Sequence, residues 1–119
     1  MDDSILDSIK DIVGVGTEDD VFDGELIAAI NTAFFTLYQL GVGGDKPFTI
    51  TSNSECWNDF INNIDELSMV KNYIGLKTRI LFDPPTSSPL MDAIKNQIAE
   101  YEWRLNVECD KSWEAIIDG

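Results

Sequence analysis

The stretch LFDPPTSSPLMD, residues 81–92, decides how the second half of this chain folds. It is rich in proline, and segments with helical periodicity lie on both sides of it. Pro84 disfavours helical geometry in the residue before it, so the preceding helix ends there, and Pro85 prolongs the extended turn. Ser88 is a suitable N-cap, and Pro89 takes the first helical position, where a missing N–H costs nothing. The stretch therefore predicts a rigid elbow between two helices, which no catalytic group is needed to explain.

Helical periodicity flanks this elbow. Large side chains recur at intervals of three and four residues in residues 65–81, and again after the elbow. The first stripe consists of Met69, Tyr73, Leu76 and Ile80, and the second of Leu90, Ile94, Ile98, Tyr101 and Leu105. Glu100 and Arg104 stand four residues apart and are expected to pair weakly on the last helix. Two helices joined by a tight turn are therefore predicted.

The first forty residues predict two further helices. Residues 2–13 carry a stripe of isoleucines and end at Gly14. Residues 20–40 are apolar almost all round and contain no charged residue after Glu25. Because so little of this second helix is suited to water, we expect it to be central in a bundle or covered by another subunit.

The middle of the chain predicts a turn, a strand and a short helix. GVGGDKP, residues 41–47, is a glycine-rich break that we interpret as a hinge or turn. FTITS, residues 48–52, alternates apolar and polar side chains, which predicts a strand. A single strand is not stable alone, so it needs a partner elsewhere in the chain or on a neighbour. Ser54 is expected to cap a short helix that ends near residues 62–63, with Trp57 facing inward.

The residues after the last clear helix form a distinct tail. Trp113, Ile116 and Ile117 are large apolar groups near the end of the chain, where segments are usually mobile unless something holds them. We therefore expect an extended tail that docks on the same chain or on a partner.

The predicted fold class is mainly all-α: a small bundle of about four to five helices, with a glycine-rich loop, one short strand or hairpin near residues 46–52, and an extended C-terminal tail. A chain of 119 residues is expected to form one domain, which we place at residues 1–107, followed by the tail at 108–119. The acidic start is unlike a basic leader, and no apolar run reaches the roughly 20 residues that cross a bilayer. We therefore expect a soluble protein that is not exported.

The net charge of the chain limits the classes of molecule that it can bind. Twenty-two acidic residues oppose eight basic ones, which gives a net charge of −14 and a pI near 4.1. Such a surface repels phosphate backbones and anionic lipids, so nucleic-acid binding is unfavourable. Much of the acid lies between Asp2 and Glu25, where Lys10 is the only base. This acidic segment is interpreted either as a solvated face or as a negative wall where tight contact with DNA must be avoided.

The sequence contains no complete motif for catalysis, cofactor binding or metal binding. The chain has no histidine, the commonest general base and metal ligand. Cys56 and Cys109 alone do not make a zinc site, and two distant thiols indicate a reducing compartment. A calcium loop counted from Asp19 fails because Val21 and Ile30 stand where oxygen ligands are required. In GVGGDK an aspartate precedes the lysine and a proline follows it, so no phosphate loop is formed. We therefore predict no enzyme activity and no cofactor.

Most of the chain resembles a known family. Phage head–tail connector proteins, also called adaptors, have a signature similar to KNYIGLKTRILFDPPTSSPLMDAIKNQIAEYEWRLNV, residues 71–107. The family is found in tailed phages and prophages of low-GC Gram-positive bacteria. Two earlier stretches also resemble this family in content and order: SILDSIKDIVGV at residues 4–15 and FDGELIAAINTAFFTLYQLGVG at residues 22–43. The likeness covers nearly the whole chain up to residue 107.

The resemblance implies a small, mostly helical structural protein with no catalytic activity. Such proteins are made in the host cytoplasm and form a ring, usually of twelve copies, beneath the portal protein in the neck of the virion. The ring extends the DNA channel and offers a platform to a stopper or tail-completion protein. DNA would pass through without specific binding, and no membrane contact is implied.

Two sets of residues are assigned to contacts within such an assembly, and the role of the tail rests on its apolar residues and not on the resemblance. The tail residues Trp113, Ile116 and Ile117 are assigned to docking on the portal. Contacts between subunits are assigned to Phe35, Lys71, Lys77, Arg79 and Arg104, whose positive charges would meet acids of the adjacent copy and set the register. The strand expected at residues 48–52 would complete a sheet across subunits.

Two other functions fit the same sequence. The small size and the charge of −14 suit a phage-encoded inhibitor that mimics DNA and binds a host protein as a compact monomer or dimer. A stopper or tail-completion protein of the same neck is also compatible with the sequence. Assembly in the presence of portal distinguishes a connector from a DNA mimic.

Overall fold

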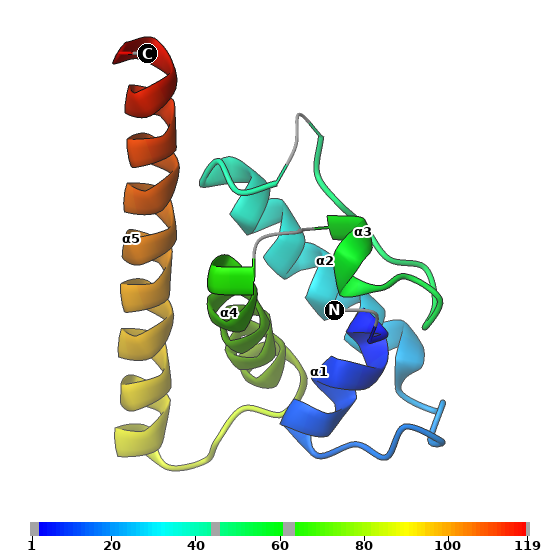
Figure 1. The fold of residues 1–119 in the computed structure, drawn as a ribbon. Coiled ribbons are helices and arrows are strands. Elements are labelled where there is room, and N and C mark those ends of the chain that lie inside the picture. The colour runs from blue at the N-terminus through cyan, green and yellow to red at the C-terminus, as the bar shows by residue number, and fades with distance from the viewer. Residues whose placement is uncertain (1–2, 44–45, 61–63, 119) are drawn as a thin grey trace.

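A computed structural model describes the backbone of residues 3–43, 46–60 and 64–118, and the side chains of these ranges except at 64–65 and 108–118. Within this part of the chain the secondary structure is helical, as Figure 1 shows. The helices are α1 (Ile5–Val13), α2 (Asp23–Gln39), α3 (Trp57–Phe60), α4 (Ile64–Phe82) and α5 (Ser88–Asp118). The predicted all-α class is confirmed.

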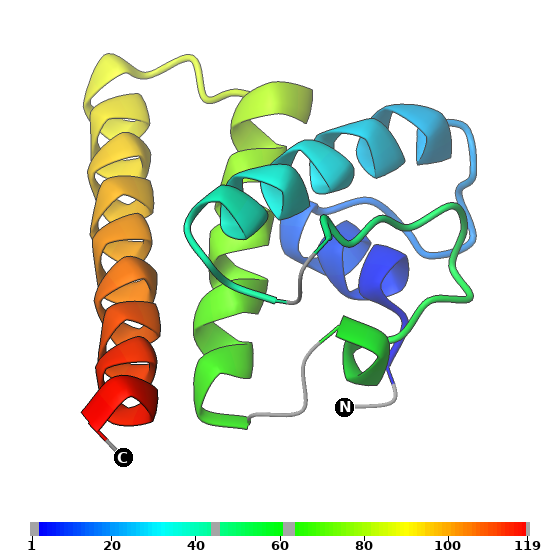
Figure 2. The same cartoon turned by 90° about the horizontal axis from the view of Figure 1, so that it is seen from above.

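Helix α4 is the centre of the arrangement. It contacts α1, α2 and α5, and its most extensive contact is with α2. Figure 2 shows α2 crossing α4. In both Figure 1 and Figure 2, α5 lies along one side of α4, while α1 and the first half of α2 lie on the other. Because α4 is long and buries apolar side chains such as Val70, Tyr73 and Ile74, it can be covered from three directions at once.

The core is built where α1, α2, α3 and α4 meet. Its largest fully buried side chains are Trp57, Tyr73 and Phe34, one each from α3, α4 and α2. The Nε1–H of Trp57 donates to the Ser8 hydroxyl at 3.1 Å, which satisfies the polar end of the buried indole. Helix α5 adds a thinner apolar contact through Ile94, Ile98 and Leu105. The predicted inward position of Trp57 is thus confirmed.

The first helix is shorter than predicted at its start. It begins at Ile5 and not at residue 2, because the Ser4 hydroxyl accepts a hydrogen bond from the Asp7 N–H at 3.3 Å and so fixes the N-cap. It ends as expected at Gly14, whose φ of 84° lets its N–H turn back to the Lys10 carbonyl. Two short-range signals, a serine and a glycine, therefore set the bounds of α1.

The predicted strand at residues 48–52 is wrong, and with it the hairpin near residues 46–52. That segment is extended but forms no ladder, because its central backbone bonds to a side chain instead. The Asn31 amide accepts from the Ile50 N–H at 2.8 Å and donates to the Ile50 carbonyl at 3.0 Å. One asparagine on α2 therefore takes the place of a neighbouring strand.

Pairing of the β type occurs a few residues later in the chain. An isolated antiparallel bridge joins Ser4 to Cys56, with the Ile5 N–H donating to the Glu55 carbonyl at 3.0 Å. It leads into α3, which begins at Trp57 and not at the predicted position after Ser54. The Asp59 carboxylate, and not Ser54, accepts the Cys56 N–H at the start of that helix, at 2.9 Å.

The elbow has the predicted form, with the cap one residue earlier. Helix α4 ends at Phe82, where the Asp83 N–H still bonds to the Arg79 carbonyl at 2.8 Å, and Pro84 and Pro85 follow in extended backbone. The hydroxyl at the start of α5 is that of Ser87, which accepts from the Leu90 N–H at 3.4 Å. Ser88 is the first residue of the helix and Pro89 is the second. Pro89 therefore lies in the first turn, where backbone N–H groups have no partner within the helix, so its lack of an N–H costs no hydrogen bond.

The predicted extended tail is also corrected, because α5 continues as helix to Asp118. Residues 108–118 contain neither glycine nor proline, and apolar residues recur in them at helical spacing, so nothing in the sequence stops the helix. Its 31 residues span about 46 Å, whereas the 19 residues of α4 span about 28 Å. Since the two helices run antiparallel from the elbow, the last part of α5 passes beyond the start of α4.

Candidate assembly surfaces

After Glu25, the exposed face of α2 carries no charge. Between Glu25 and Asp45 the sequence has no acidic or basic residue, in a chain of which 25 % is charged. Phe35 and Tyr38 remain 49 % and 37 % exposed on this face, with their ring centroids 6.2 Å apart. Large apolar groups that stay in water next to one another indicate a surface that meets another molecule. The assignment of Phe35 to a contact between subunits stays a prediction.

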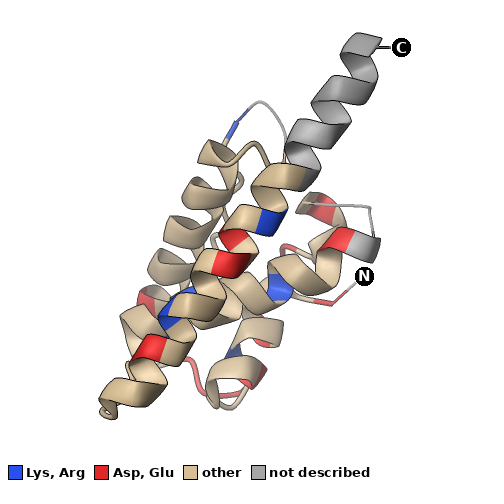
Figure 3. Cartoon of the chain, turned by 90° about the vertical axis from the view of Figure 1, so that its left-hand side faces the viewer, with Lys and Arg blue, Asp and Glu red and all other residues tan. Residues whose placement is uncertain are grey.

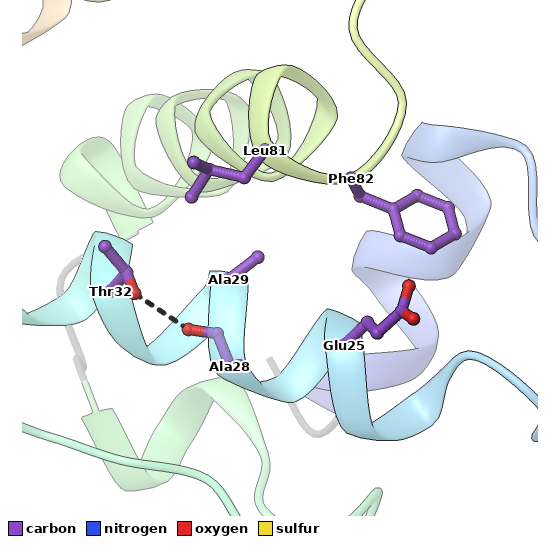
Figure 4. A pocket seen from close by; sticks show the side chains of 6 residues that line it. All are labelled: Glu25, Ala28, Ala29, Thr32, Leu81 and Phe82. Carbon is purple, nitrogen blue, oxygen red and sulfur yellow. Dashed lines mark hydrogen bonds between the residues drawn. The ribbon is translucent and has the colours of Figure 1, made fainter.

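An open groove lies between α2 and the end of α4. It encloses about 370 Å³ and is lined by Glu25, Ala28, Ala29, Thr32, Leu81 and Phe82, as Figure 4 shows. The Thr32 hydroxyl donates to the Ala28 carbonyl at 2.9 Å, so it is already satisfied within its own helix. Leu81 is 56 % exposed above the groove. What remains open to a partner is therefore an apolar trough with one carboxylate, Glu25, at its edge.

The groove was not predicted from the sequence. It arises because two small neighbours on α2, Ala28 and Ala29, lie opposite two large side chains on α4, Leu81 and Phe82. Phe22 closes one side by an edge contact with Phe82, at 5.3 Å between ring centroids. The only sequence signal was the pair of alanines inside an otherwise bulky helix.

The outer face of α5 presents Trp103. This indole is 67 % exposed, whereas Ile98 and Leu105 on the same helix are buried against α4. Its neighbour Arg104 donates to the Glu100 carboxylate at 2.7 Å across one helical turn, in the pair that the spacing predicted. Both members of that pair are about half exposed, so the contact is weak and exchangeable. Figure 3 shows charges of both signs along this helix.

The four basic residues predicted to lie at subunit contacts do not form one patch. Lys77 is 3.8 Å from the Glu102 carboxylate, and its ammonium lies 5.9 Å from the Tyr73 ring. Lys71 lies over the Trp57 ring at 5.4 Å, six residues before Lys77 on α4. Arg79 is partly buried on the same helix, and Arg104 lies on α5. The structure thus already engages Lys71, Lys77 and Arg104 within the chain.

Helices α4 and α5 are fastened by a buried tyrosine. The Tyr73 hydroxyl donates to the Glu102 carboxylate at 2.7 Å. Burial raises the pKa of this phenol, and the hydrogen bond to Glu102 and the charge of that carboxylate raise it further. Because Glu102 also faces Lys77, the outer helix is held in position near its middle by polar contacts as well as by packing.

The acidic segment after α1 is organised around one buried base. Lys10 is 2 % exposed, and its ammonium lies 2.6 Å from the Asp23 carboxylate and 2.9 Å from the Asp19 carbonyl. It reaches the Thr17 carbonyl as well, at 3.4 Å. A buried lysine needs such partners, so these contacts fix the loop between α1 and α2. The remaining acids of the segment, such as Glu18 and Asp20, point to solvent.

The residues predicted to dock on the portal lie outside the described side chains. Trp113, Ile116 and Ile117 belong to the part of α5 for which only the backbone is described. Of the predicted elbow residues, Pro84 and Pro85 lie between α4 and α5, whereas Ser88 and Pro89 are the first two residues of α5. Their position matters for assembly because the elbow sets which face of α5 is turned outward.

The described residues offer little for other kinds of site. No cluster of three or more potential metal ligands occurs there. Of the helices described, none is both long enough and apolar enough to span a membrane. Cys56 is a free, partly buried thiol whose Sγ lies 3.6 Å from the Ser54 carbonyl.

An uncharged helix face, an apolar groove and an outward-facing tryptophan define a helical protein that works by contact with other chains. The chain belongs to the phage connector protein family, whose family model matches residues 5–112. This membership supports a structural role in the neck of the phage virion. No curated protein and no solved structure shows significant similarity to the chain.

Proposed function

We propose that this protein forms an oligomeric ring beneath the portal, extends the DNA channel, and provides a platform for a stopper or tail-completion protein. The observation that carries the proposal is the match to phage connector proteins over residues 5–112. The exposed apolar surfaces on α2 and α5 support it, because a small chain that acted alone would gain nothing from leaving them in water.

The charge of the chain supports its place beside DNA. A net charge of −14 opposes adhesion of the phosphate backbone, so DNA would pass without specific binding. The solvated acids between Thr17 and Glu25 are the strongest local source of this field. In the proposed ring they face the channel or its entrance.

Subunit contacts are proposed to use the residues assigned from the sequence. Phe35 supplies exposed apolar area, and Lys71, Lys77, Arg79 and Arg104 supply positive charge opposite acids of the adjacent copy. Because Lys77 and Arg104 already have partners within the chain, they would contribute to register more than to affinity.

Docking on the portal is proposed to use the end of α5. The helix is about 18 Å longer than α4, and its last residues lie past Val107, where the described core ends. Trp113, Ile116 and Ile117 stand in these turns at helical spacing and would supply large apolar anchors.

Electron microscopy of the native virion neck tests this function directly. We expect density for this chain in a closed ring immediately below the portal, and light scattering should detect assembly of the purified protein when portal is added. A protein that is absent from mature particles and binds a host protein as a single copy would overturn the proposal in favour of a DNA mimic. A position further down the neck would identify it as a stopper.

A further inference from the structure

Electrostatic repulsion limits where two copies of this chain can touch. Each copy carries a net charge of −14, so surfaces rich in acid repel one another. The face of α2 from Leu26 to Gln39 has no charged residue, and it borders the groove between α2 and α4. A second copy can therefore approach this face without bringing like charges together.

The same chain carries a matching surface on its opposite side. Trp103 is exposed on α5, and in both Figure 1 and Figure 2 α5 lies on the other side of α4 from the first half of α2, which supplies Glu25, Ala28 and Ala29 to the groove. Two different surfaces on opposite sides of one molecule suit head-to-tail contact, which closes into a ring when the rotation between copies permits. A surface that paired only with itself would stop at a dimer.

We propose that the groove formed by Glu25, Ala28, Ala29, Thr32, Leu81 and Phe82 receives Trp103 on α5 of the next copy of this chain. This inference rests on the proposed ring and names the surfaces that build it. The groove of about 370 Å³ is large enough for an aromatic side chain, and its apolar walls suit the faces of an indole.

The charges beside the two surfaces are complementary. Glu25 is the only ionisable residue that lines the groove, and Arg104 follows Trp103 on α5. When the indole enters the groove, Arg104 can leave its exposed partner Glu100 and meet Glu25 of the neighbour, where water is partly excluded. The pair then fixes the orientation of one copy on the next.

A mixing experiment with two variants tests this contact. Ala28→Glu places a second carboxylate in the groove, and Trp103→Glu removes the anchor from α5; both positions are exposed, so folding should be retained. Each variant alone is expected to associate about tenfold or more weakly than wild type in analytical ultracentrifugation. Mixed together, they should form a one-to-one heterodimer, because one supplies an intact Trp103 and the other an intact groove.

The control is Asn53→Glu, which adds the same charge on an exposed loop outside both surfaces and should associate like wild type. Circular dichroism of all variants checks that they fold. If wild-type oligomers persist in both variants, or if the mixture stays monomeric, this contact is wrong while the ring itself stands. Wild-type protein that stays monomeric at every soluble concentration, with and without portal, overturns the ring and this contact together.

Discussion

A single amide on α2 shapes the loop that the sequence suggested was a strand. Ile50 is 1 % exposed, so its N–H and carbonyl are out of reach of water and need partners within the protein. Asn31 supplies both partners, since a primary amide can donate and accept at once. Asparagine at this position therefore replaces the ladder that an extended segment ordinarily requires.

Replacing Asn31 with alanine should lower the free energy of unfolding by about 1–3 kcal/mol, because two buried backbone groups lose their partners. Asn31→Asp should lose less, since it keeps an acceptor for the Ile50 N–H but no donor for the carbonyl. Urea denaturation measures both changes, with exposed Asn96→Ala as a control expected within about 0.5 kcal/mol of wild type. Equal stability of Asn31→Ala and wild type would contradict this role.

Glu55 gives the same loop a dependence on pH. Burial alone would raise the pKa of this carboxyl, but hydrogen bonds from the backbone and hydroxyl of Thr51 and the backbone of Ser52 outweigh it and hold the pKa below its usual value of 4.5. The stability that this carboxylate contributes is therefore fully present above about pH 4.5 and is lost as the pH falls through the lowered pKa.

Comparison of Glu55→Gln with wild type tests this dependence. Wild type should be the more stable protein at pH 6, and the difference in unfolding free energy should shrink as the pH is lowered from about 4.5 toward 3. Thermal or urea unfolding at several pH values measures it. A difference that stays constant over this range would show that the charge of Glu55 is not what holds the loop.

At the scale of elements, the start of α5 is set by a hydroxyl beside the prolines. Ser87 and Ser88 are adjacent, and only Ser87 accepts a helix N–H in the structure. The two serines are equally suited to capping by residue type, so the choice between them depends on where the backbone leaves its extended form after Pro85.

Substitution of these two serines separates the cap from its neighbour. Ser87→Ala should destabilise the protein by about 1 kcal/mol through the loss of the cap, whereas Ser88→Ala, one residue inside the helix, should change stability by less than about 0.5 kcal/mol. Chemical denaturation of both variants under identical conditions gives the answer. The reverse order of effects would place the cap at Ser88.

For the whole molecule, the part of α5 beyond Val107 is not required for the described core. On α5 the buried apolar side chains described are Ile94, Ile98 and Leu105, and the rest of the described core lies in the four preceding helices and the segments that join them. A chain that ends at Val107 should therefore keep its helical circular dichroism and unfold in one cooperative transition.

The same truncated chain should fail to attach to portal, because it lacks Trp113, Ile116 and Ile117, yet it should still associate with itself through Trp103. Co-sedimentation with portal and ultracentrifugation of the protein alone measure the two properties separately. If truncated protein still decorates portals, docking by the end of α5 is refuted, whereas loss of self-association would argue that the end of α5 also joins the copies.

Much of this architecture could be predicted because its signals are local. The elbow follows from the geometry that proline imposes, the end of α1 from a glycine at positive φ, and the long helices from their apolar spacing. The bounds of short elements could not be predicted as well. The start of α3 is set by the bridge between Ser4 and Cys56, which are distant in sequence, and by the Asp59 carboxylate, which competes with other polar groups nearby such as Ser54.

The sequence by itself determined the helical class, the elbow, the strong negative charge and the membership of the connector family, because each depends on residue types at short spacing or on their sum. Only the tertiary structure decided that the backbone of Ile50 binds to Asn31 and that Lys10 holds the acidic loop. It also decided that Ala28 and Ala29 face Leu81 and Phe82 across a groove. These features join residues from different parts of the chain. Their meeting depends on how α2 crosses α4, which the packing of the whole core sets.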